Sequence, residues 1–176
     1  MRLALLALGL LVAGPGLLQA SSYGAMQQRE IRALSSEQMQ DLLAGRGMAQ
    51  ALAAELNGWP GPMHVLEHAD ALNLTPRQRE ETEALMAAHR ADAIALGTRL
   101  VEAERVLDLA FRDRRITAAT LVTQTDAIGA LQGQLRAEHL RTHLRQTALL
   151  SAEQVARYAE LRGYAAPAQG AHRHRH

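Results

Sequence analysis

The chain has 176 residues, of which 48% are hydrophobic but only 3% aromatic, and its formal net charge is +1. Because much of the apolar fraction is alanine and leucine, which favour helices, this composition argues against a sheet or an aromatic-filled core. A near-neutral chain with mixed signs has no electrostatic footprint for nucleic acid or an anionic membrane. Cysteine is absent, which excludes disulfides and restricts any metal site to His, Met, Asp and Glu.

Residues 1–20 are predicted to be an export signal. Arg2 provides the positive start, residues 3–12 form an apolar run, a Gly-Pro-Gly sequence breaks it, and cleavage is expected after Ala20. The run is too short to cross a bilayer, which needs ~20 apolar residues. We therefore expect the mature chain in the periplasm, with an uncleaved inner-membrane anchor as the alternative.

Residues 21–58 are predicted to be an N-terminal helical segment. After an irregular polar start, a helix is expected from about Ser35, where Ser-Ser-Glu-Gln resembles a capping sequence, to about Leu56. Gly45 and Gly47 weaken this helix in its middle. The sequence Asn-Gly-Trp-Pro-Gly-Pro then ends the segment, because it combines strong helix breakers.

Residues 59–164 are predicted to form the principal domain. A short helix is expected over 63–72, and Thr75 then caps a long helix whose apolar spacing continues to Phe111. At 1.5 Å per residue this helix is ~50 Å long. Thr117 is the expected cap of a second long helix, and Ser151 is the cap of a last short one.

Two long helices joined by a short turn lie antiparallel. The expected fold class is therefore all-α: a long antiparallel helical hairpin with short flanking helices. Each long helix carries one apolar stripe, and a bare pair leaves part of that stripe exposed. A second copy or a concave client-binding face would cover it, and we expect a homodimer.

A five-residue pattern occurs twice, as Leu-Thr-Pro-Arg-Gln at 74–78 and Leu-Ser-Ala-Glu-Gln at 150–154. The pair resembles the LTxxQ motifs of the Spy/CpxP family of periplasmic proteins, with a mild serine-for-threonine change in the second copy. The resemblance covers about residues 60–164. It implies a four-helix hooked hairpin, usually dimeric, that either restrains a signalling partner in a metal-dependent way or holds unfolded proteins without ATP. Segments 63–68 and 138–143 are more similar to the heavy-metal sensor and metal-resistance branch.

Two histidine pairs have the spacing of a helical metal site, His64 with His68 and His139 with His143. Side chains four residues apart project from one helix face with Cβ atoms ~5–6 Å apart, so two imidazoles can share a cation. In the expected antiparallel arrangement both pairs belong to one end, where they would bind a transition metal ion: Zn, Cu, Ni or Co. The alternative is structural, because His139 continues the apolar stripe of its helix.

Met86 and His89 are weaker candidates for the same site. Sensors of the resembled branch take a further ligand from this part of the long helix. A thioether would favour copper over zinc, whereas a methionine that fills the core is the alternative. The tail at 165–176 is predicted to be disordered, and its alternating histidines would capture metal loosely: His172, His174 and His176.

The sequence has no nucleophile elbow, no phosphate-binding glycine loop and no His-Glu-x-x-His motif, so we expect no enzyme. Two functions remain. The first is a periplasmic metal sensor or buffer whose state a membrane-bound signalling partner reads. The alternative is an ATP-independent periplasmic holding chaperone, or envelope stress protein, that binds unfolded clients. Its concave face would mix apolar residues with arginines: Arg90, Arg99, Arg105, Arg136 and Arg145.

Overall fold

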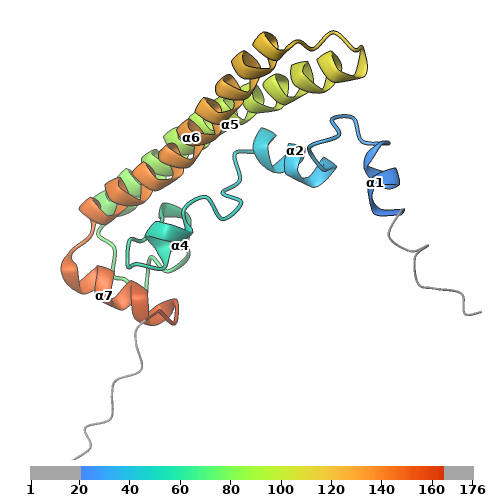
Figure 1. The fold of residues 1–176 in the computed structure, drawn as a ribbon. Helices are drawn as coiled ribbons and strands as arrows, with labels where there is room; N and C mark the ends of the chain where they lie inside the picture. The colour runs from blue at the N-terminus through green and yellow to red at the C-terminus, as the bar shows by residue number, and fades with distance from the viewer. Residues whose placement is uncertain (1–20, 165–176) are drawn as a thin grey trace, which may run out of the picture.

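The computed structural model describes residues 21–164, and within that range the chain is all-helical (Figure 1), which confirms the all-α part of the predicted fold class. The elements are α1 (Ser21–Met26), α2 (Ser36–Leu43), α3 (Leu52–Glu55), α4 (Pro62–Glu67), α5 (Pro76–Arg112), α6 (Ala118–Leu149) and α7 (Ala152–Leu161). The expected signal and the histidine-rich tail lie outside the described residues. None of the described helices is both long enough and apolar enough to cross a bilayer.

Four helices begin at the hydroxyl residues that the sequence predicts as caps: Ser35, Thr75, Thr117 and Ser151. Each hydroxyl accepts a hydrogen bond from the backbone N–H three residues on, and the side chain at that position bonds back to the cap's own N–H. Pro76 takes the first position of α5, where a missing N–H costs nothing. The predicted caps are therefore confirmed.

Helices α5 and α6 are the two long elements and run side by side in opposite directions, joined by residues 113–117 (Figure 1). Their facing sides bury small and branched side chains, among them Ala93, Leu100, Ile128, Leu131 and Leu135. The apolar stripe predicted for α6 is buried, whereas Phe111 at the end of the α5 stripe is 53% exposed. The seam therefore weakens toward the connecting turn.

The N-terminal segment of the same chain covers part of this seam. Ile31 and Leu42 are buried in the core formed with α5 and α6, and Met39 and Met48 pack against that core. Helix α2 approaches α5 so closely that a Cβ on Gly97 would lie 2.1 Å from the carbonyl oxygen of Leu42. Residues 31–48 thus occupy apolar surface that the sequence analysis assigned to a second copy or a client.

Two expected helices are shorter than predicted. The helix expected over 35–56 is divided, because Gly45, Met48 and Ala49 adopt positive φ between α2 and α3. The helix expected over 63–72 ends at Glu67, and turns follow it as far as Asn73, whose φ is 50°. These turns bring Leu72 beside Val65 and Tyr158 in a second small core. The irregular start expected at 21–30 contains the short helix α1.

The glutamines of the two LTxxQ-like motifs bind each other. The Nε2 of Gln78 donates to the Oε1 of Gln154 and to the carbonyl of Leu149, both at 2.8 Å. The Nε2 of Gln154 donates to the carbonyl of Leu72 at 3.1 Å. Besides capping a helix, each motif therefore ties the start of α5 to the start of α7.

Candidate metal site

A cavity of about 580 Å³ lies between the N-terminal segment, helix α4 and the facing parts of α5 and α6. Residues 44–52 form one wall, and the remaining walls carry the side chains with metal-binding chemistry. These potential donors are His64, His89, His139, His143, Met48, Met63 and Met86. The cavity therefore collects imidazoles and thioethers from three helices and one loop.

Five of the six residues predicted for the metal site line this cavity: His64, Met86, His89, His139 and His143. His68 does not line it; this residue is the C-cap of α4, where the helix has already ended. The predicted pairing of His64 with His68 on one helical face therefore does not carry over to the cavity. Within residues 21–164, no three His, Asp or Glu side chains are grouped closely enough to hold one metal ion as they stand.

His143 is oriented by a backbone acceptor. Its Nδ1 lies 2.7 Å from the carbonyl oxygen of Trp59, and because a carbonyl only accepts, Nδ1 carries the proton. The other ring nitrogen, Nε2, is then left with a free lone pair, which is the arrangement found for metal-binding histidines. Gly61 makes room for this nitrogen, since a Cβ there would lie 2.8 Å from it.

His64 and His89 are held in the same manner through Nδ1. The Nδ1 of His64 is 2.7 Å from the Oε2 of Glu67, and this hydrogen bond is the main cause of the lowered pKa of that carboxyl. The Nδ1 of His89 is 3.0 Å from the hydroxyl of Thr142, which also lies 3.0 Å from the backbone carbonyl oxygen of Glu138. In His64, whose partner is a carboxylate, Nε2 is therefore the nitrogen with the free lone pair.

His139 is the most deeply buried imidazole, at 4% exposure, and its Nε2 has no hydrogen-bond partner. Its ring meets that of His89 edge-on, with centroids 4.6 Å apart. Burial lowers the pKa of His139 to about 4, and it lowers the pKa of His89 as well. Both rings are therefore neutral near pH 7, which is the protonation state that a metal ion requires.

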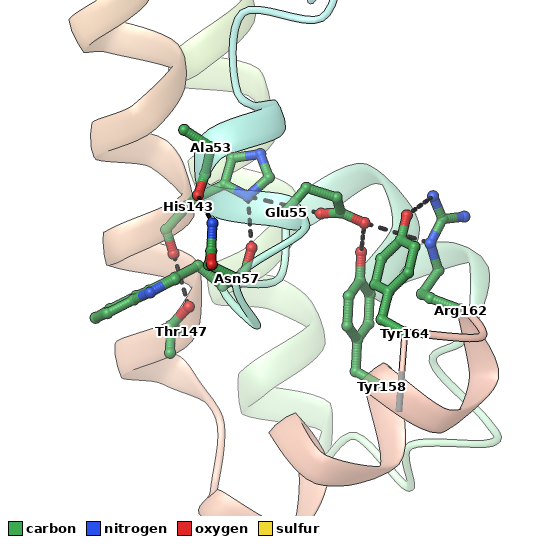
Figure 2. Close-up of polar contacts among 9 residues, drawn as sticks. Ala53, Glu55, Asn57, His143, Thr147, Tyr158, Arg162 and Tyr164 are labelled. Atoms are coloured by element: carbon green, nitrogen blue, oxygen red, sulfur yellow. Dashed lines mark hydrogen bonds and ion pairs between the residues drawn. The ribbon is translucent and has the colours of Figure 1, made fainter. Parts of the chain in front are cut away.

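Sequence reasoning missed a buried carboxylate beside the cavity, Glu55 of α3, which is 7% exposed. Figure 2 shows it between His143 of α6 and two residues at the C-terminal end of the chain, Tyr158 of α7 and Arg162, the C-cap of that helix. Tyr158 donates to its Oε1 at 2.5 Å, and the Nε of Arg162 lies 3.3 Å from the same oxygen. No spacing signal marks Glu55, because its partners on α7 are more than 100 residues away.

The donor chemistry of the cavity fits a transition metal ion. Neutral imidazoles suit Zn, Cu, Ni and Co, and thioethers shift the preference toward copper. Hard cations such as Mg²⁺ and Ca²⁺ take several oxygen ligands. The cavity fits them poorly, because Glu55 is the one carboxylate in the described part of the chain that lines it. Because three ligands are not yet grouped, a bound ion would have to draw the side chains together.

Comparison with known proteins adds no relative. No family model, no curated protein and no solved structure matches the chain.

Proposed function

We propose that this chain is a periplasmic metal-binding protein that senses or buffers a transition metal ion through the histidines of the cavity. The observation that supports this most is the hydrogen bonding of the imidazoles. On His64 and His143 an acceptor holds Nδ1 and leaves Nε2 without a proton, and both residues line one cavity together with His89 and His139. Histidines that only filled space in a helical core would need no such arrangement.

The separation of the ligands suits a sensor. A metal ion would have to draw His64 of α4 and the imidazoles of α5 and α6 together, so that metal binding and a change of shape are coupled. A membrane-bound signalling partner would read that change. We propose that the chain acts as a homodimer built as a hooked helical hairpin, as the resemblance to the Spy/CpxP family implies.

Metal titration of the mature chain tests the proposal. In a background with His172, His174 and His176 changed to alanine, we expect one ion of Zn²⁺, Cu⁺, Ni²⁺ or Co²⁺ to bind per chain, measured by calorimetry or chelator competition. His143→Ala should weaken binding by at least about tenfold, because it removes a ligand. His68→Ala is the matched control and should change the affinity little, since His68 lies off the cavity. Unchanged affinity after the double change His64→Ala with His143→Ala would remove the proposed site.

The holding chaperone remains the alternative prediction, and no contact in the structure favours it. Its proposed face is partly occupied by the chain's own residues 31–48, and Arg105 is bound at 2.5 Å to Glu30, which directly precedes them. An aggregation assay with a denatured client separates the two functions. Suppression that persists with chelator present would favour the chaperone.

A further inference from the structure

Among the described residues 21–164, Glu55 is the one buried carboxylate that touches both the cavity and helix α7. Its two oxygens have different surroundings. Oε1 accepts the hydroxyl of Tyr158 at 2.5 Å and faces the guanidinium of Arg162 at 3.3 Å. Oε2 is buried, has no hydrogen-bond partner, and lies 3.7 Å from Nδ1 of His143 (Figure 2).

An unpartnered carboxylate oxygen in the interior is costly, so its position calls for an explanation. The neighbouring imidazole offers one. The Nδ1–H of His143 points to the Trp59 carbonyl, and Oε2 of Glu55 lies 3.7 Å from the same nitrogen, just beyond hydrogen-bond distance. A carboxylate behind a histidine makes the opposite nitrogen a stronger metal ligand, which is a common arrangement in metal sites.

We propose that Glu55 is a positioning residue that strengthens His143 as a ligand and couples occupation of the cavity to the seating of helix α7. The inference rests on the proposed metal-binding function and adds how metal binding would be coupled to helix α7. Glu55 carries one negative charge, which already forms an ion pair with Arg162. A cation on Nε2 of His143 draws the same charge toward Oε2, so that Arg162 and the metal ion compete for one carboxylate.

Helix α7 is a suitable element to receive this signal. It contacts the rest of the chain through Tyr158, which is 1% exposed, and through Gln154, and its C-cap residue Arg162 forms the ion pair with Glu55. Weakening that ion pair loosens the last turn of α7. Because coupling between two sites is reciprocal, loosening α7 by mutation must in turn favour the metal ion.

Opposite effects of two substitutions in the same ion pair test the inference. Glu55→Gln should weaken metal binding by about tenfold, as expected for loss of a supporting carboxylate. Arg162→Gln should strengthen it by roughly threefold, because a partly exposed competing charge is removed. In the Glu55→Gln background, Arg162→Gln should have no effect. Arg157→Gln is the matched control, since Arg157 is on the same helix but pairs only with the exposed Glu160.

Hydrogen exchange of α7 gives a readout besides affinity. Saturating metal should raise the exchange rate of the amides at 158–162 about threefold in the wild-type chain, with no rise in Glu55→Gln. Arg162→Gln changes a part-buried side chain that stays polar, whereas Glu55→Gln changes a buried one, so the arginine variant should fold even if Glu55→Gln does not. If the wild-type chain binds no metal, the proposed function fails. If it binds metal but Arg162→Gln behaves as Arg157→Gln does, only the coupling through Glu55 is wrong.

Discussion

At the scale of single residues, the cavity contains two buried imidazoles, His89 and His139, that are neutral near pH 7 because burial lowers their pKa. His139 and His89 lie against each other at the seam of α5 and α6, with Glu138 and Thr142 as their polar neighbours. Their lowered pKa values mean that the unfolded chain binds more protons than the folded chain between pH 6.5 and about 4. The stability that depends on these rings is therefore fully present above pH 6.5 and is lost as the pH falls toward 4.

The first prediction concerns this pH dependence. Between pH 7 and pH 5, His139 alone should lower the free energy of unfolding by about 2 kcal/mol, measured by urea denaturation. The change His139→Leu, which continues the apolar stripe of α6, should flatten that part of the pH profile. His68→Leu, at a half-buried position off the cavity, should leave it unchanged. A profile equally steep in His139→Leu would contradict the buried, neutral state of this ring.

At the scale of the elements, the docking of α2 depends on one glycine. Gly97 is in the interior of α5, and its missing side chain leaves room for the last turn of α2. A Cβ there would lie 2.1 Å from a backbone oxygen and 2.8 Å from a backbone carbon of Leu42, neither of which can rotate away. The contact therefore requires glycine for space.

The second prediction compares two glycines in long helices. Gly97→Ala should lower the free energy of unfolding by about 2 kcal/mol, because overpacking outweighs the gain in helix propensity. Gly129→Ala on α6 meets no atom within 4 Å and should raise it by about 0.5–1 kcal/mol. Chemical denaturation of both variants measures the difference. Equal stability of the two would mean that α2 does not sit on Gly97 in solution.

The elements were predictable to the extent that their signals are local. The helix starts at Ser35, Thr75, Thr117 and Ser151 were readable, because a capping box needs only four consecutive residues. A break in the middle of the 35–56 helix was foreseen from Gly45 and Gly47, whereas the positive φ of Met48 and Ala49 carries no sequence signal. The end of α4 at Glu67 was missed because it is set by distant packing against α7.

For the candidate site, too, the features with a local sequence signal were predictable and the features set by distant contacts were not. The spacing of His139 and His143 on one helix was readable, and so was their place near His64, because both follow from helix period and chain direction. The tautomers, by contrast, depend on the Trp59 carbonyl and on Thr142. The part played by Glu55 depends on Tyr158 and was invisible for that reason. Local periodicity thus gives the candidate ligands, and tertiary contacts give their chemistry.

At the scale of the whole molecule, the chain covers its own apolar seam. Ile31 is fully buried and Leu42 is 4% exposed, whereas the ion pairs of Arg32 with Asp108 and of Arg105 with Glu30 lie at the surface. Surface ion pairs contribute ~0–1 kcal/mol each, so the apolar side chains must hold the segment in place. The homodimer was predicted because a bare pair of helices leaves its apolar seam exposed. Since residues 31–48 cover part of that seam, a dimer would have to use another face.

The third prediction follows from that covering. Leu42→Asp places a charge in the core, so the N-terminal segment should detach and expose the seam of α5 and α6. We expect the variant to bind a hydrophobic dye more strongly and to show a higher mass than the wild-type chain by light scattering, because exposed apolar surface of this kind drives association. Leu43→Asp, one residue on and 47% exposed, should behave as the wild type. If Leu42→Asp keeps the wild-type mass and dye binding, residues 31–48 do not shield the seam, and the case for covering it with a second copy is restored.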